Sequence, residues 1–164
     1  AMIVKNKLHA DVLAWEVEMP DLNIDAENLD YELQDGSLFG SLPTRFENKD
    51  SILLKKIKNS LNINYIKEKV PNYKEIDIKI FKDIPGFKLF PHLDAPHHKA
   101  FLMFNLTNNI DSTTFHNTQK EFLCKGPNKK NMGVFHLLRT KPEILHAIEN
   151  TSNKNRYTAI AFIK

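Results

Sequence analysis

A histidine and an aspartate two residues apart, His92 and Asp94, are the first residues whose types and spacing suggest chemistry. In an extended segment, residues i and i+2 project to the same side, so this imidazole and this carboxylate can bind one metal ion together. The pair alone is weak evidence, because seven histidines and ten aspartates in 164 residues produce about 0.4 such pairs by accident. A third ligand from elsewhere in the chain is needed to support a metal site.

His146 is the third candidate ligand. It lies in an otherwise apolar segment, residues 144–148, where a polar ring needs a hydrogen-bond partner or a metal ion. Two histidines and one carboxylate occupy one face of an octahedral ion and leave the other face for substrates, which is the ligand set of non-haem Fe(II) oxygenases. The same ligands can hold Zn(II) and activate water for hydrolysis, so they do not by themselves decide the reaction.

Arg156 and Thr158 follow His146 and share one strand face with Ile160 and Phe162. A guanidinium and a hydroxyl at one end of an apolar lining suit a carboxylate, because the guanidinium gives a bidentate contact and the hydroxyl a further hydrogen bond. The pattern predicts that a dicarboxylic acid reaches from the arginine to the metal. A zinc hydrolase has no use for such an arginine.

The chain from about residue 76 to residue 164 resembles the Fe(II)/2-oxoglutarate-dependent dioxygenases, in particular their prolyl-hydroxylase-like branch. The resemblance is carried by GFKLFPHLDAP at residues 86–96, FNL at 104–106, LHAI at 145–148 and RYT at 156–158. It implies a double-stranded β-helix, or jelly roll, with helices packed outside. It also implies that His92, Asp94 and His146 are the Fe(II) ligands.

The resemblance further implies 2-oxoglutarate as cosubstrate and O2 as oxidant. Arg156 and Thr158 match the Arg-x-Ser/Thr pair that binds the distal carboxylate of 2-oxoglutarate, and Asn105 stands where a tyrosine frequently contacts it. Such enzymes hydroxylate an unactivated C–H bond and release succinate and CO2, here with a prolyl residue or an amino acid, peptidyl or free, as the expected substrate. The family's glycine-rich segment is replaced by DSTTF at residues 111–115. A non-catalytic jelly-roll binding module and a Zn(II) hydrolase remain as alternatives.

Residues beside the His-x-Asp pair receive other interpretations. His97 and His98 are assigned to a loop at the mouth of the site, because further ligands would close the open metal positions. Lys99 is interpreted as a solvated lysine, whereas Phe101 and Met103 share a strand face with Asn105 and are candidates for an apolar lining. The remaining histidines, His9, His116 and His136, are interpreted as structural.

The elements that must position these residues are mainly strands. Alternating apolar and polar residues predict strands around 15–19, 76–80, 87–93, 100–107, 113–116, 132–138, 144–149 and 156–163. One helix is expected after Asp50 as N-cap, with apolar residues from Ile52 to Tyr65 and Pro71 just past its end. Residues 21–49, with turn signals at 35–37 and 42–43, are expected to form loops with room for one short helix. The pattern predicts a mainly β protein, a sandwich or barrel behind an N-terminal helical layer.

Length and composition favour one soluble domain over residues 1–164, with an N-terminal strand and helix layer (1–75) and a β core that carries the metal site (76–164). A net charge of +3, from 23 basic and 20 acidic residues, is too small and dispersed to indicate a nucleic-acid partner. Apolar runs of at most five residues fall far below the roughly 20 that a membrane span needs. With no apolar secretion segment at the start and a single cysteine, Cys124, we expect a cytoplasmic protein.

Overall fold

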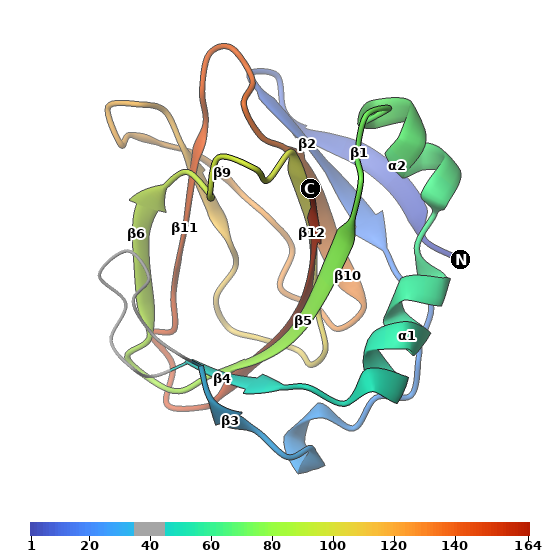
Figure 1. Ribbon diagram of the computed structural model, residues 1–164. Coiled ribbons are helices and arrows are strands. Elements are labelled where there is room, and N and C mark those ends of the chain that lie inside the picture. Colours follow the sequence, from blue (N-terminus) through green and yellow to red (C-terminus); the bar gives the residue numbers. More distant parts are fainter. Residues whose placement is uncertain (35–44) are drawn as a thin grey trace.

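The computed structural model describes residues 1–34 and 45–164, which form a mainly β fold with a few short helices (Figure 1). The strands are β1 (Ile3–His9), β2 (Val12–Glu18), β3 (Glu32–Leu33), β4 (Arg45–Asn48), β5 (Ile76–Asp83), β6 (Lys88–His92), β7 (Ala100–Asn105), β8 (Thr114–His116), β9 (Phe122–Lys125), β10 (Met132–Leu137), β11 (Leu145–Glu149) and β12 (Arg156–Ile163). The helices are the 3-10 helix Ala26–Asn28, α1 (Ser51–Ser60) and α2 (Ile63–Lys69).

Within the described ranges, these strands form two antiparallel sheets. The major sheet has the order β1-β2-β10-β7-β12-β5-β4-β3, and the minor sheet has the order β6-β11-β8-β9. Figure 1 shows the two sheets facing each other, with α1 and α2 on the side of the major sheet that faces away from the minor sheet. This is the jelly roll with an outer helical layer that the sequence predicts.

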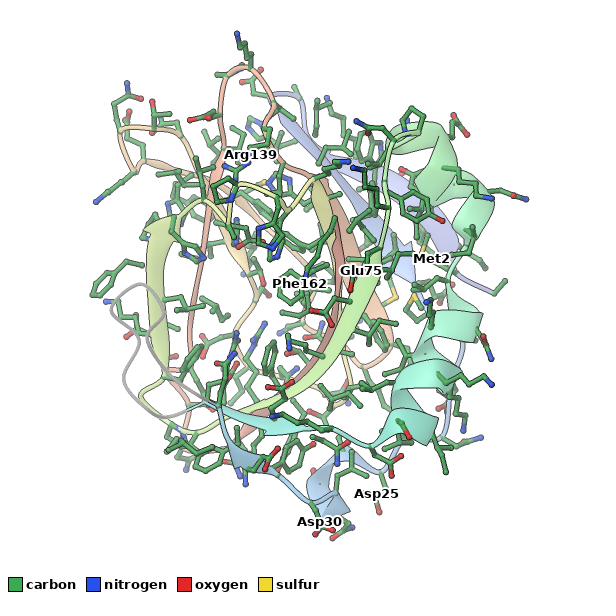
Figure 2. All side chains as sticks on the ribbon, viewed as in Figure 1. Met2, Asp25, Asp30, Glu75, Arg139 and Phe162 are labelled. Carbon is green, nitrogen blue, oxygen red and sulfur yellow. The ribbon has the colours of Figure 1, made fainter. Side chains whose placement is uncertain are left out.

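The alternation of side chains along the major sheet separates two cores. The β12 residues Tyr157 and Ile163 pack in a core with the helix residues Ile57 and Ile66. On the opposite face of β12, Phe162 packs in the second core, between the sheets, where Figure 2 shows it inside the barrel. The predicted face of Arg156, Thr158, Ile160 and Phe162 is therefore the inner face of the major sheet.

Strands β10 and β7 approach each other closely at Gly133, which lies opposite Phe104. A Cβ atom at Gly133 would overlap the carbonyl oxygen of Met103 and the Cα of Phe104. A residue without a side chain is therefore required at this point of the major sheet.

The predicted helix begins where expected but is interrupted. The side chain of Asp50 accepts hydrogen bonds from the N–H groups of Ile52 and Leu53, so it is the N-cap of α1. The prediction of one continuous helix to Tyr65 is wrong, because Leu61 is extended and Asn62 starts α2 by accepting a hydrogen bond from the Tyr65 N–H. The side chain of Leu61 is buried in the core at this break.

All eight segments predicted as strands contain a strand, but residues 1–34 and 45–164 form four further strands that were not predicted. These are β1, β3, β4 and β9. The expectation of loops over residues 21–49 is therefore wrong for β3 and β4, whereas the short helix is present at Ala26–Asn28. The predicted turns at 35–37 and 42–43 lie outside the described residues.

No helix among the described residues has the length and apolar character needed to cross a membrane.

Candidate metal centre and anion-binding cavity

The three predicted metal ligands lie together on the minor sheet. His92 ends β6, Asp94 follows two residues later, and His146 lies directly opposite His92 on the neighbouring strand β11. Each residue offers one ligand atom, and these atoms all lie within 4.8 Å of one another. Asp94 Oδ1 is 2.9 Å from Nε2 of His146 and 3.7 Å from Nε2 of His92. The pairing of β6 with β11 thus brings Asp94 within hydrogen-bonding distance of His146, 52 positions later in the chain.

The surroundings of Asp94 and His146 favour the protonation states that bind a metal. Burial raises the pKa of Asp94, but the neighbouring imidazoles of His146, His92 and His98 outweigh it and hold that pKa well below its usual range. Burial lowers the pKa of His146, which favours the neutral imidazole. Asp94 Oδ2 and His146 Nδ1 are buried and have no hydrogen-bond partner within the described ranges. Two imidazoles and a carboxylate fit a divalent ion such as Fe(II) or Zn(II).

His98 lies closer to the cluster than the sequence suggests. Its Nδ1 is 3.6 Å from Asp94 Oδ2, and its ring packs against Phe162 with centroids 4.8 Å apart. His97 is exposed and stacks on His98. Both residues belong to the loop after the His-x-Asp pair, as expected, but His98 also contacts the carboxylate itself.

Arg139 supports the same loop from the segment after β10. Its guanidinium donates hydrogen bonds to the carbonyl oxygens of Asp94 and Ala95, the second at 2.6 Å. Figure 2 labels this side chain at the upper end of the barrel. The main chain that carries the metal-binding carboxylate is therefore held by an arginine from another part of the sequence.

A fully buried histidine, His136 on β10, lies behind the cluster. Its ring packs between Phe101 and Phe115, with centroid distances of 5.3 and 5.0 Å, and lies 6.1 Å from the ring of His146. Burial lowers the pKa of His136 to about 3. The ring is therefore neutral and serves as packing between the sheets, in agreement with its structural interpretation.

A cavity extends from the metal cluster to Arg156. Its apolar lining is formed by Leu89, Phe101, Met103, Ile148, Ile160 and Phe162. The predicted lining roles of Phe101 and Met103 are thus confirmed. Its polar lining includes His92, Asp94, His146, Arg45 and Arg156. The guanidinium of Arg156 and the metal-ligand cluster therefore both border the same cavity between the two sheets.

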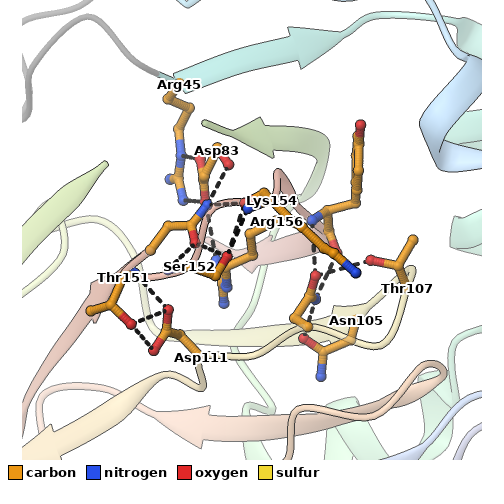
Figure 3. A network of polar contacts seen from close by, with 12 residues as sticks. Arg45, Asp83, Asn105, Thr107, Asp111, Thr151, Ser152, Lys154 and Arg156 are labelled. Carbon is orange, nitrogen blue, oxygen red and sulfur yellow. Dashed lines mark hydrogen bonds and ion pairs between the residues drawn. The ribbon is translucent and has the colours of Figure 1, made fainter. Parts of the chain in front are cut away.

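The end of the cavity near Arg156 is a network of two arginines and one aspartate (Figure 3). Asp83 on β5 is fully buried and lies between Arg45 on β4 and Arg156 on β12 in the strand register. Arg45 donates to Asp83 from Nε at 2.7 Å and from Nη2 at 3.0 Å, and Arg156 donates from Nη1 at 3.1 Å. The sequence did not predict this pairing, although Arg45 is one of only three arginines and could have been singled out on that ground.

Arg156 and Thr158 keep unused polar atoms. Arg156 Nε and Thr158 Oγ1 are buried without a hydrogen-bond partner among the described residues, and Arg156 is only 3% exposed. Buried donors normally find partners, so Arg156 Nε, whose residue lines the cavity, fits an acceptor supplied by a ligand, such as a carboxylate. Thr158 neighbours Arg156 on the same strand face but is not among the residues that line the cavity.

Asn105 and Lys99 lie outside the cavity lining. The Asn105 side chain donates to the carbonyl oxygens of Pro127 and Met132, and its own carbonyl accepts from Asn109. It is not among the residues that line the cavity. Lys99 donates to the carbonyl oxygen of Asn72, so it binds the protein's own main chain.

Fold and site together define a jelly-roll protein with a cluster of two histidines and one carboxylate. No protein-family model matches the sequence, and no curated protein is similar to it in sequence. Among solved structures, a prolyl-4-hydroxylase from Pseudomonas putida is similar with a TM-score of 0.64 and 11% identity, over 94% of this chain and 94% of that chain.

Two other solved structures have a similar fold. A prolyl hydroxylase from Trichoplax adhaerens, in complex with a hypoxia inducible factor peptide fragment, has a TM-score of 0.57 and 11% identity, over 73% of this chain and 62% of that chain. A viral collagen prolyl hydroxylase from Paramecium Bursaria Chlorella virus-1 has a TM-score of 0.50 and 15% identity, over 73% of both chains. These likenesses confirm the predicted fold, which the chain shares with prolyl hydroxylases.

Proposed function

We propose that the protein is an Fe(II)- and 2-oxoglutarate-dependent oxygenase that hydroxylates an unactivated C–H bond. The observation that carries this proposal is the cavity onto which a two-histidine, one-carboxylate cluster and a buried arginine both open. A zinc hydrolase needs the cluster alone. A dicarboxylic 2-oxo acid needs a metal at one end and a cationic donor at the other, and this cavity offers both.

Each residue of the site has a defined task in this proposal. His92, Asp94 and His146 hold Fe(II), while Arg156 and Thr158 bind the distal carboxylate of 2-oxoglutarate. Fe(II), 2-oxoglutarate and O2 together supply the oxidation of the C–H bond, with release of succinate and CO2. Asn105 is left out of the binding set, because its amide is already fully engaged with the protein.

The proposed substrate is a prolyl residue or an amino acid. A groove beside the cavity shares His92, Asp94 and the partly buried ring of Phe162 with it. Aromatic side chains suit the apolar ring of proline. The peptide bound to the Trichoplax prolyl hydroxylase supports a peptidyl substrate.

The test is an anaerobic titration of the Fe(II)-loaded protein with 2-oxoglutarate, followed by the visible charge-transfer band of the chelate. Admission of O2 with candidate prolyl peptides and free amino acids should then release succinate. His92→Ala should abolish the band, whereas His97→Ala removes an exposed imidazole of the neighbouring loop and is the matched control.

The alternatives give different results in the same preparation. Tight binding of Zn(II) with no response to 2-oxoglutarate would support a hydrolase. If 2-oxoglutarate does not shift the melting temperature in Mn(II), the protein is a non-catalytic binding module, because a ligand that binds the folded state must stabilise it.

A further inference from the structure

Arg45 lines the same cavity as the metal cluster and Arg156, although it lies on β4, outside the segments that resemble known dioxygenases. Its side chain is 11% exposed. Its Cζ lies 4.1 Å from the ring centroid of Phe81 and 4.4 Å from that of Phe87, so the guanidinium is stacked on aromatic rings as well as paired with Asp83. Such contacts fix the plane of an arginine and pre-organise its N–H groups.

The end of the cavity near Arg156 is positively charged only because Arg45 is present. Asp83 pairs with both arginines, and its carboxylate would cancel the charge of Arg156 if Arg156 stood alone. An incoming carboxylate would then meet a neutral, buried ion pair. With Arg45 present, two guanidinium groups share the carboxylate of Asp83, which leaves one positive charge among the groups that contact the cavity and matches one carboxylate of a ligand. Asp111 also acts on Arg156, but it is bonded to Thr151 and does not line the cavity. The other acid on the inner face of β4, Glu47, is paired with Lys79 at 3.3 Å.

We propose that Arg45 is a second carboxylate-binding residue of the cavity, and that Asp83 is the positioning residue that holds both guanidinium groups for one distal carboxylate. This inference rests on the proposed function and extends it to ligand selection. The paired arginines select dicarboxylic over monocarboxylic 2-oxo acids, because only a dicarboxylic acid brings a second anion to this end of the cavity.

The experiment measures ligand affinity by titration calorimetry of the full chain loaded with Mn(II), which does not support turnover. The probes are 2-oxoglutarate and 2-oxobutyrate, which share the metal-chelating 2-oxo acid group but differ in the distal carboxylate. Arg45→Ala should raise the Kd for 2-oxoglutarate about ten- to a hundredfold, since a hydrogen bond to a charged group is lost, and leave the Kd for 2-oxobutyrate unchanged. Arg45→Lys, which keeps the charge without the planar fork, should fall between.

Lys82→Ala is the matched control. Lys82 precedes Asp83 on β5, but its ammonium lies over the rings of Tyr31 and Phe46 rather than in the cavity. Its removal deletes one positive charge from the same pair of strands and should not change either Kd. A rise in the Kd for 2-oxoglutarate equal to that of Arg45→Ala would overturn the inference, because the effect would then be general electrostatics.

A double variant separates direct contact from charge balance. In Arg45→Ala/Asp83→Asn, Arg156 is the remaining guanidinium of the network, and its charge is no longer neutralised by Asp83. If Arg45 contacts the ligand directly, the affinity of this variant for 2-oxoglutarate should stay weak. Recovery of the parent's affinity would overturn direct binding by Arg45. An unchanged Kd in Arg45→Ala, together with a raised Kd in Arg156→Ala, would refute this inference alone. A parent that binds no 2-oxoglutarate would refute the proposed function as well.

Discussion

The buried imidazole of His136 should make the stability of the fold depend on pH. Burial lowers its pKa from an ordinary value of 6.5 to about 3, so between these values the unfolded chain binds a proton that the folded chain does not. The unfolded state therefore gains free energy of protonation as the pH falls, and the fold loses stability. For one such group, the free energy of unfolding should fall by about 2 kcal/mol between pH 7 and pH 5.

The variant His136→Phe removes this dependence. Phenylalanine can occupy the site between Phe101 and Phe115, and the polar contact that the His136 ring gives up is with the main chain of Leu13. The variant should therefore lose about 2 kcal/mol less than the parent between pH 7 and pH 5. Titrating groups that do not interact with His136 contribute equally to both proteins, so the difference between them isolates His136 and its coupling to His146 and Asp94.

The assay is urea denaturation of the metal-free protein with EDTA, followed by the fluorescence of the single tryptophan, Trp15. Trp15 packs against the core and under the ammonium of Lys69, so its emission should change on unfolding. His97→Gln, which replaces an exposed imidazole outside the barrel core, is the matched control. The reasoning is refuted if His136→Phe and the parent lose the same free energy between pH 7 and pH 5.

Three further variants test the metal loop and the sheet. Asp94→Asn should abolish Mn(II) binding measured by electron paramagnetic resonance, because the anionic ligand of the cluster is lost; retained binding would exclude the assigned ligand set. Arg139→Gln should weaken Mn(II) binding in the same assay by about 10- to 100-fold, since the main chain at Asp94 and Ala95 loses its support, and an unchanged affinity would show that the loop needs no such support. Gly133→Ala should lower the free energy of unfolding in urea by about 1–3 kcal/mol or more, because its Cβ overlaps β7; a neutral effect would contradict the close approach of these strands.

The central strands and the metal cluster could be predicted because their signals are local. In β12, alternation from Arg156 to Phe162 assigns each side chain to one face, whatever the neighbouring strands are. His92, Asp94 and His146 were recognisable by type and by the order of their segments. Their actual contact depends on the β6–β11 register, which no local pattern determines.

The elements that were missed lack such signals. The strand β4 reads Arg-Phe-Glu-Asn, with one apolar residue, so it has no period to detect. Its pairing with β5 brings Arg45 to Asp83, 38 residues away, and sequence periodicity carries no information about that pairing. The sequence does contain a signal for the helix break, because Asn62 is a good N-cap. The helical spacing of apolar residues continues across Asn62, however, so the periodicity predicted one continuous helix.

The position of β12 in the major sheet determines when the site can form during synthesis. β12 lies between β7 and β5, so that Thr158 faces Asn105 on one side and Phe81 on the other, and these two strands have no direct pairing with each other. Until residues 156–163 leave the ribosome, β5 and β7 present unpaired edges, and such contacts between distant segments form slowly. His92 and Asp94 emerge long before His146 and Arg156. A nascent chain therefore cannot assemble the metal cluster before His146 has emerged, and the anion-binding end of the cavity forms only when β12 has been completed.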